Sequence, residues 1–370
     1  MSMNPFRYGS VVEGENFCPR PALETQIRQY AESGQNLVVQ GARRMGKTSL
    51  LKHAVGGIRG MRLVYVDLYF IKTPSDFCAR VMKGVSAASA DLPFLRRALQ
   101  LAFRLRPTLS VSPADGTPTI SVDARAAADP DSVWATMEAL SKIAEGGRTC
   151  IVFDEFQDIL HLNGSDRILA EMRGTIQFQG TVPYFFTGSS RNAMMDIFDG
   201  MDSPFYKSAL PLEVGEIDPP SFTRFLIARF RKGDRRISAE TVAKILEFAD
   251  SVPGDAQELC EALWSTTAPG AQITEADFPA ALGLVFSREI RGYEAVLEKL
   301  TPAQSTVLRS LAANGRERLA SADFAARTGL AASSAKRVVG RLLADRIVFS
   351  RAGEYRFSNP FFREWLLRNA

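Results

Sequence analysis

The sequence predicts an α/β domain with a parallel sheet, followed by a helical domain and a winged helix-turn-helix. In the first 215 residues, short apolar runs alternate with helical stretches, which is the pattern of strands joined by helices. The signals are then helical to about Gly292, and the last 70 residues read as three helices and a hairpin. We expect the three domains to span 1–216, 217–294 and 295–370, since a chain of 370 residues usually holds more than one core.

Five near-continuous apolar runs in the first domain are typical of strands that are buried on both faces. These runs are Asn36–Gln40, Arg62–Leu68, Cys150–Asp154, Pro183–Gly188 and Ala209–Val214. A further stretch, Pro107–Asp123, alternates polar and apolar residues around Asp115-Gly116, which predicts an inserted hairpin.

The last 70 residues carry their own start and turn signals. Thr301 is the expected N-cap of a helix, with Pro302 at its first position. "SADFAARTG" and "AASSAKRVVGRLLADR" follow as two helices joined by a short turn, and "IVFSRAGEYRFS" gives two strands around Ala352-Gly353. This order predicts a winged helix.

The composition is that of a globular protein, with 46% hydrophobic and 23% charged residues. No apolar run approaches the roughly 18–20 residues that span a bilayer, and the N-terminus shows no secretion signal, so we expect a cytoplasmic protein without a membrane partner. The four cysteines have no CxxC or Cys/His spacing, which indicates reduced, mostly buried thiols. The chain has only two histidines, which excludes a multi-histidine metal centre.

Charge is distributed unevenly, although the net charge is only +4. From Thr301 onward, twelve Lys or Arg stand against five Asp or Glu, so this segment carries +7 and the preceding 300 residues carry −3. A basic segment on a mildly acidic body suggests binding to a polyanion. The alternative is a solvated surface whose arginines point in all directions.

The stretch "GARRMGKT" matches G-x-x-x-x-G-K-[ST] at Gly41, Gly46, Lys47 and Thr48. Its glycines let the backbone wrap around phosphate, so that N–H groups point inward at the oxygens. The helix that follows adds its positive end. Lys47 would meet the β and γ phosphates, and the Thr48 hydroxyl would bind Mg²⁺. The residues expected to hold ATP or ADP here are Gly41, Ala42, Arg43, Arg44, Met45, Gly46, Lys47, Thr48 and Ser49.

The run "CIVFDEFQD" is an apolar strand that ends in Asp154-Glu155. Asp154 would hold Mg²⁺ and Glu155 would polarise the attacking water. A water-activating carboxylate beside the metal argues against a small-molecule kinase, which needs a site for a hydroxyl acceptor. Without the upstream loop, the same run would indicate only a buried strand with an acidic end.

The run "FFTGSS" ends another strand in Thr187, Ser189 and Ser190. A polar residue here can lie between the two carboxylate-bearing loops, so Ser189 is a candidate to hold the water or sense the γ phosphate. Arg191 follows directly and could reach phosphate, although an ordinary surface arginine explains it equally well.

Together, "GARRMGKTSL", "IVFDEFQD", "FFTGSSRNAMMDIF" and "SPFYKSALPLEVGEIDP", with a terminal winged helix, resemble the archaeal-type ATPase family. That family belongs to the STAND class of P-loop NTPases, which are relatives of AAA+ proteins. The resemblance covers nearly the whole chain.

The resemblance implies a sheet in the order 5-1-4-3-2, a helical lid, and a winged helix that can fold back on the nucleotide. It also implies that Phe17 and Arg20 lie beside the adenine. Many relatives carry Arg just after the "SP-x-Y" element, where this chain has Lys207. Lysine lacks the planar fork of arginine, so the residue with the arginine-finger role is open. The lid stretch Asp250–Trp264, where relatives sense the nucleotide, shows no clear sensor arginine.

The expected recognition helix carries Lys336, Arg337 and Arg341, and the wing carries Arg351 and Arg356. Such an arrangement suits contact with a DNA groove and its flanking phosphates. The alternative is a regulatory or protein-binding module, which is common for winged helices of STAND-type proteins.

The function predicted from these features is slow, Mg²⁺-dependent hydrolysis of ATP by a nucleotide-dependent conformational switch. The alternative is a nucleotide-gated DNA-binding regulator or initiator with little turnover. Duplex DNA, a protein partner and a nucleotide-dependent homo-oligomer are the partners left open.

Overall fold

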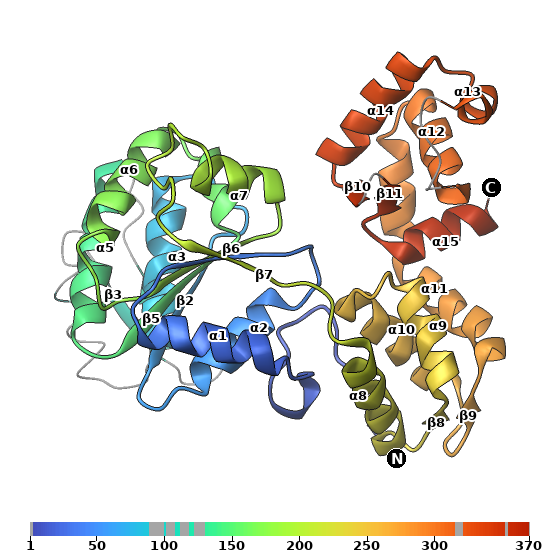
Figure 1. Ribbon diagram of the computed structural model, residues 1–370, viewed down its shortest axis with the longest axis horizontal. Coiled ribbons are helices and arrows are strands. Elements are labelled where there is room, and N and C mark those ends of the chain that lie inside the picture. The colour runs from blue at the N-terminus through green and yellow to red at the C-terminus, as the bar shows by residue number, and fades with distance from the viewer. Residues whose placement is uncertain are drawn as a thin grey trace. The chain divides into compact units, whose positions relative to one another are not determined.

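The computed structural model describes residues 3–88, 100, 108–111, 118–121, 130–314, 321–351 and 354–369. The chain forms two compact units (Figure 1). One unit is Val11–Gly215, and the other combines Met1–Ser10 with Glu216–Ala370. The three predicted domain boundaries stay a prediction, and each unit is described by itself.

The Val11–Gly215 unit is built on a five-stranded parallel sheet. Its strands are β1 (Leu37–Gln40), β2 (Arg62–Asp67), β5 (Thr149–Asp154), β6 (Tyr184–Gly188) and β7 (Leu210–Glu213). Their spatial order is β2-β5-β6-β1-β7. Numbered along the chain, this is 5-1-4-3-2 from the β7 edge, so the predicted strands and order are confirmed.

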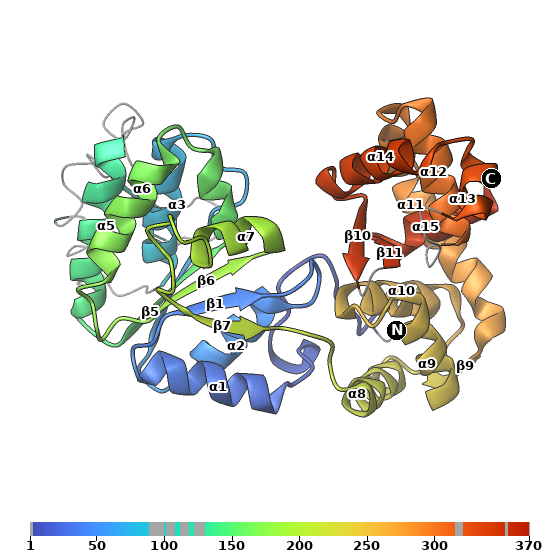
Figure 2. The same cartoon turned by 45° about the horizontal axis from the view of Figure 1, so that its top comes forward.

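Helices cover both faces of this sheet. In chain order they are η1 (Gly14–Asn16), α1 (Pro21–Glu32), α2 (Lys47–Gly56), α3 (Pro74–Ala87), α5 (Pro130–Glu145), η3 (Phe156–His161), α6 (Ser165–Ile176) and α7 (Arg191–Phe198). Figure 2 shows α1 and α2 on one face and α3, α5, α6 and α7 on the other. Every residue of β5 and β6 is buried, as the apolar runs predicted.

Aromatic side chains fill much of the core on the second of these faces. The ring centroids of Phe156 and Phe186 lie 4.7 Å apart, and Phe198 and Phe205 pack against both. Because Phe156 lies two residues after the end of β5, this packing fixes the turn that carries Asp154 and Glu155.

The predicted hairpin is confirmed as β3 (Thr108–Val111) paired antiparallel with β4 (Pro118–Ser121). Its expected turn, Asp115-Gly116, lies outside the described residues.

The second unit begins with a helical part, as predicted. Its elements are α8 (Pro219–Lys232), β8 (Arg236–Ile237), α9 (Ala239–Phe248), α10 (Pro253–Thr266), β9 (Gln272–Ile273), η4 (Glu275–Asp277) and α11 (Phe278–Glu298). The two short strands pair with each other and were not predicted. The first residues of the chain belong to this unit, since the Asn4 amide donates to the Glu261 carboxylate at 3.2 Å.

The winged helix completes the second unit in the predicted order. It comprises α12 (Pro302–Ala313), α13 (Ala322–Thr328), α14 (Ala332–Ala344), β10 (Val348–Arg351), β11 (Glu354–Phe357) and α15 (Pro360–Arg368). Thr301 caps α12 in a capping box with Gln304, as its sequence indicated. The helix α15 was not predicted; its Phe361 packs on Phe248 at 5.2 Å between ring centroids.

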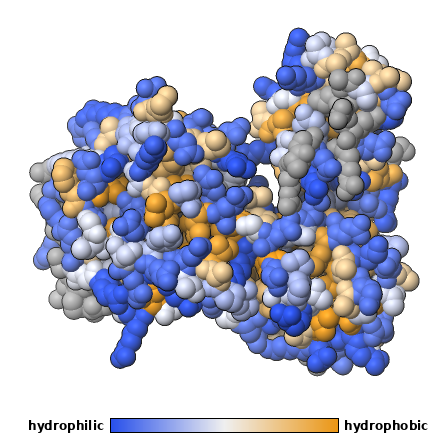
Figure 3. All heavy atoms as spheres, viewed as in Figure 1, coloured by the Kyte–Doolittle hydropathy of each residue, from blue (hydrophilic) through white to orange (hydrophobic). Residues whose placement is uncertain are grey.

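All four cysteines are free and buried, as predicted. Burial raises the pKa of the Cys18 thiol to about 11. Among the described residues, no helix is long and apolar enough to cross a membrane. On the face shown in Figure 3, hydrophilic residues cover most of the surface and hydrophobic residues form small groups.

Candidate active site

The loop between β1 and α2 has a backbone that depends on its glycines. A Cβ on Gly41 would lie 2.5 Å from the carbonyl oxygen of Val214, so no larger residue fits there. Gly46 has φ = 83° and directly precedes α2, while Arg44 also takes a left-handed conformation, with φ = 65°. The result is a tight loop that ends at the N-terminus of a helix, a geometry suited to an anion.

Lys47, the first residue of α2, is buried and points back into this loop. Its Nζ donates to the carbonyl oxygens of Gly41 at 2.8 Å and Ala42 at 3.1 Å. Burial lowers the pKa of the ammonium, partly opposed by the charges of Glu155 and Asp154. A buried cation whose hydrogen bonds go to carbonyl oxygens can gain further stabilisation from an anion such as phosphate.

Asp154 ends β5 and lies opposite the start of α2. Its Oδ2 accepts hydrogen bonds from the Thr48 hydroxyl at 2.6 Å and from the Tyr65 hydroxyl at 2.5 Å. Its Oδ1 accepts from the backbone N–H of Glu155 at 3.0 Å. The structure therefore brings together Thr48 and Asp154, the two residues expected to hold magnesium.

Tyr65 belongs to this group, although no sequence motif marks it. It lies in β2, in register with Val152 of β5, so its side chain is beside the strand that carries Asp154. Burial and the Asp154 charge raise the pKa of its hydroxyl, which keeps it protonated as a donor. A tyrosine two residues before the end of the neighbouring strand is the signal that could have identified it.

Glu155 follows in a left-handed conformation, with φ = 51°. Its Oε2 accepts three hydrogen bonds: from the Ser189 N–H at 3.2 Å, the Ser189 hydroxyl at 2.8 Å and the Gln157 amide at 2.6 Å. Ser189 thus meets Glu155 at the carboxyl ends of neighbouring strands. Gln157 was not identified from the sequence as part of the site.

The remaining loop residues differ in exposure. Ala42, Arg43 and Gly46 are exposed, Gly41, Arg44 and Thr48 are partly exposed, and Met45, Lys47 and Ser49 are buried. The Ser49 hydroxyl accepts a hydrogen bond from the Val12 N–H at 3.1 Å, so this side chain ties the start of α2 to the N-terminal segment.

Two basic residues outside the loop are also exposed. Arg191 is exposed at the first position of α7. Lys207 is exposed with its Nζ 5.1 Å from the ring centroid of Tyr206.

The two residues expected beside an adenine are both buried and engaged. Phe17 stacks on His53 with ring centroids 4.3 Å apart. The Arg20 guanidinium donates to the carbonyl oxygens of Met45 at 2.7 Å and Gly215 at 2.8 Å. Arg20 therefore supports the phosphate loop from behind, and its adenine contact stays a prediction.

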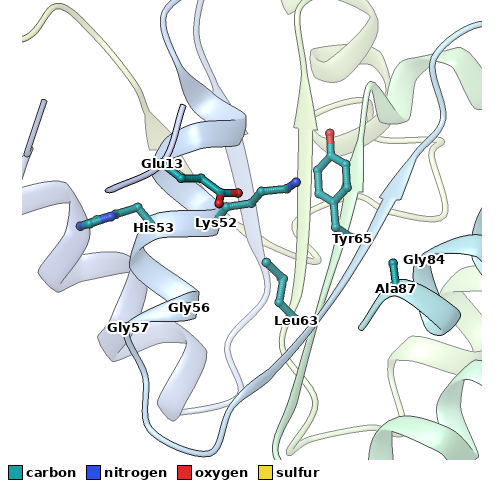
Figure 4. A pocket seen from close by; sticks show the side chains of 9 residues that line it. All are labelled: Glu13, Lys52, His53, Gly56, Gly57, Leu63, Tyr65, Gly84 and Ala87. Atoms are coloured by element: carbon teal, nitrogen blue, oxygen red, sulfur yellow. The ribbon is translucent and has the colours of Figure 1, made fainter. Parts of the chain in front are cut away.

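A cavity of about 550 Å³ adjoins the site on the Tyr65 side. Figure 4 shows Glu13 directed toward Lys52 and the Lys52 ammonium directed toward the ring of Tyr65, whereas His53 points away. The Lys52 Nζ lies 4.7 Å from the centroid of the Tyr65 ring. Tyr65, whose hydroxyl donates to Asp154, therefore also lines this cavity.

In the winged helix, Lys336, Arg337 and Arg341 are exposed on α14. The side chain of Arg351 lies outside the described part. Arg356, expected on the wing surface, instead forms ion pairs with Asp250 at 2.5 Å and with Glu354 at 3.2 Å. Its guanidinium joins the wing strand to the turn before α10, and the expected phosphate contact stays a prediction.

The described residues contain no cluster of three or more His, Cys, Asp or Glu that could hold a metal ion. The hydroxyl of Thr48 and the carboxylate of Asp154 are hard oxygen donors, which is the chemistry that Mg²⁺ prefers. A metal with two protein ligands and the remaining positions filled by phosphate and water fits this set.

Comparisons with known proteins support the fold. A family model described as a probable winged helix domain matches residues 291–368, and no curated protein sequence matches the chain. The Walker-type ATPase of Pyrococcus abyssi is 18% identical, with a TM-score of 0.68, over 98% of this chain and 99% of that one.

Two structures of the ORC2 protein of Aeropyrum pernix are also similar, each 14% identical. The ADPNP–ADP complexes give a TM-score of 0.56 over 98% of this chain and 96% of that one. The ADP form gives 0.50 over 96% of each chain. The STAND class and the archaeal-type family stay predictions, but the chain has the fold of a P-loop ATPase with a C-terminal winged helix domain.

Proposed function

We propose that the protein binds ATP with Mg²⁺ and hydrolyses it slowly, as a nucleotide-dependent conformational switch. The observation that carries the proposal is the grouping of Lys47, Thr48, Asp154 and Glu155 around the N-terminus of α2. The four were expected from two separate motifs more than 100 residues apart. Their convergence would supply a phosphate-binding cation, a metal site and a base, which supports the proposal.

Triphosphate binding would use the loop from Gly41 to Thr48. The N–H groups at the start of α2 would face the phosphate oxygens, and Lys47 would exchange the carbonyls of Gly41 and Ala42 for the β and γ phosphates. Thr48 and Asp154 would hold Mg²⁺, which when bound neutralises charge on the β and γ oxygens.

Hydrolysis would proceed by in-line attack of water on the γ phosphorus. The bond from phosphorus to the β–γ bridging oxygen breaks, ADP leaves, and Glu155 takes the proton of the water. Ser189 holds Glu155 in place through two hydrogen bonds. We expect slow turnover because Lys207 stands where many relatives of the resembled family carry arginine, and an arginine finger contributes roughly 10³–10⁵ to the rate.

Lys47→Met tests the proposal, because methionine removes the charge and keeps a long unbranched side chain. We expect the natural chain to release phosphate from ATP when Mg²⁺ is present, and the variant to release none. Lys142→Met, which removes a surface lysine of α5 that is paired with Glu138 at 2.7 Å, is the control and should match the natural chain. Equal phosphate release from Lys47→Met would contradict the proposal.

The switch is supported by the two points at which the chain passes between its units, Ser10–Val11 and Gly215–Glu216. Both are tied to the phosphate loop. Near the first, the Val12 N–H donates to the Ser49 hydroxyl at 3.1 Å. At the second, the Arg20 guanidinium joins the Gly215 and Met45 carbonyl oxygens. A loop that moves when it wraps around phosphate would pull on both connections.

Fluorescence energy transfer between the units tests the switch. Dyes can be placed on Phe178→Cys and Ala344→Cys, which replace exposed residues in different units, while the natural cysteines are buried. We expect transfer to differ between the ATP and ADP states. Identical transfer in both states would leave an ATPase without the proposed switch.

A nucleotide-gated DNA-binding regulator is the second candidate. The exposed Lys336, Arg337 and Arg341 on α14 of the winged helix favour it. We expect duplex DNA to bind in an ATP-dependent way. The slope of log affinity against log salt should become shallower by about 0.9 in Arg337→Ala and in Arg341→Ala, since each variant neutralises one phosphate fewer. Binding that is unchanged in both variants would exclude this helix as the DNA-binding surface.

A further inference from the structure

Gln157 connects two carboxylates in the interior of the candidate site. Its side chain is 3% exposed, and its Nε2 lies 2.6 Å from Glu155 Oε2 and 3.0 Å from Asp158 Oδ1. Of the two ends of this amide, only the NH₂ group can donate to both acceptors, so the orientation of the amide is dictated by its neighbours.

The other end of the same amide has no partner. Gln157 Oε1 is buried and makes no hydrogen bond with any described residue. It lies against Gly188, where a Cβ would approach it to 2.3 Å, so the glutamine fits only because Gly188 has no side chain. A buried, unpaired carbonyl oxygen is unfavourable, because it loses its hydrogen bonds to water without gaining others. The fold keeps this glutamine at a cost that an apolar residue would avoid.

Asp158 fixes Gln157 from the opposite side. It is 5% exposed, and its Oδ2 accepts a hydrogen bond from the Phe70 N–H at 2.7 Å. Phe70 has φ = 60° and stands in the turn after β2. A continuous set of hydrogen bonds thus runs from the Phe70 backbone through Asp158 and Gln157 to Glu155.

We propose that Gln157 is a positioning residue that, together with Ser189, anchors Glu155 Oε2. This rests on the proposed function. Three donors hold Oε2, whereas no described residue donates to Oε1 within hydrogen-bond distance. Glu155 is therefore presented with one oxygen fixed and the other open to take the proton of the attacking water. Small displacements of such a group reduce the rate strongly, because proton transfer needs heavy atoms at hydrogen-bond distance.

The first test is Gln157→Leu, which removes the donor and the unpaired oxygen at similar volume. We expect kcat for ATP hydrolysis to fall about 10- to 100-fold, while KM and the Kd of a fluorescent ATP analogue change less than about twofold. The hydrogen bonds of Gln157 go to Glu155 and Asp158 and not to Lys47 or Thr48, so ground-state binding should persist. Gln179→Leu, at another buried glutamine of the same unit, is the control and should keep the natural kcat.

The second test asks whether Gln157 acts through Glu155. In the Glu155→Gln background we expect Gln157→Leu to cause no further loss, because the group that it positions is already gone. Gln157→Met repeats both comparisons with an unbranched side chain. In either variant, retained binding of the ATP analogue shows that the site is folded.

A loss of the same size in both backgrounds, an equal loss in Gln179→Leu, or an unchanged kcat in Gln157→Leu would each overturn this inference. If the natural chain is active and Gln157→Leu has an unchanged kcat, this inference is refuted but the proposed ATPase is not. A natural chain that releases no phosphate overturns both this inference and the proposed ATPase.

Discussion

The Tyr65 hydroxyl donates a 2.5 Å hydrogen bond to Asp154 Oδ2, the same oxygen that accepts the Thr48 hydroxyl at 2.6 Å. The carboxylate expected to hold magnesium is thus held from both sides, by α2 and by the neighbouring strand β2. This arrangement fixes the direction in which its remaining lone pairs point.

Tyr65→Phe removes that donor and keeps the ring. We expect the Mg²⁺ concentration for half-maximal ATP hydrolysis to rise about tenfold, because groups that orient metal ligands typically contribute 10- to 100-fold to affinity. The measurement is phosphate release over a Mg²⁺ titration at saturating ATP. Tyr206→Phe, at a more exposed tyrosine of the same unit, should leave the curve unchanged. Coinciding curves for Tyr65→Phe and the natural chain would show that Tyr65 does not orient Asp154.

ATP affinity should depend on pH through Lys47. Burial lowers the pKa of this ammonium, with Glu155 and Asp154 opposing and Arg43 adding to the effect. Bound phosphates favour the charged form and raise the pKa again, so binding is strongest while Lys47 is already protonated. We expect affinity to fall as the pH rises from neutral through the lowered pKa.

Titration of a fluorescent ATP analogue between about pH 7.5 and 10, at constant ionic strength, measures this dependence. Lys47→Met should bind weakly and show no comparable slope. A natural chain whose affinity is flat over that range would show that Lys47 does not titrate in the site.

Arg20→Met keeps an apolar side chain and removes the guanidinium group that donates to the carbonyl oxygens of Met45 and Gly215. We expect the nucleotide-dependent change in energy transfer between the units to be lost, while ATP-analogue binding weakens by less than about tenfold, since Lys47 and Thr48 remain. The dye-labelled protein described above provides both readouts. Retention of the full change in transfer would locate the coupling elsewhere.

Phe361→Ala should destabilise the second unit by about 3–5 kcal/mol, because Phe361 is fully buried and packs on Phe248. Denaturant unfolding followed by tryptophan fluorescence measures the loss. Phe178→Ala, at a phenylalanine that is 83% exposed, should change stability by less than about 0.5 kcal/mol. Similar small losses in both variants would mean that α15 contributes little to this unit.

Sequence alone predicted the features whose signals are continuous along the chain. The five apolar runs, the loop at Gly41 and the N-cap at Thr301 each depend on local residues, and the structure has them where they were expected. The sheet order came from the resemblance to a family, and it too is confirmed.

The features that were missed depend on pairs that are distant in sequence. Tyr65 meets Asp154 only because β2 and β5 are adjacent in the sheet, and Arg356 meets Asp250 only because the wing packs near the turn before α10. Gln157 is close to Glu155 in sequence, but its role depends on Gly188 leaving room for its amide. Such contacts become visible only once the chain has folded.

The most direct test of the central claim is steady-state ATP turnover by the natural chain and by Glu155→Gln, with analogue binding measured in parallel. Glu155→Gln keeps the shape of the side chain and removes its basicity. We predict that the natural chain hydrolyses ATP slowly in the presence of Mg²⁺, and that Glu155→Gln binds ATP but turns it over about 10²–10⁴-fold more slowly, with a residual rate that can still be measured. Equal turnover by the two proteins, or ATP binding without turnover in the natural chain, would contradict the account.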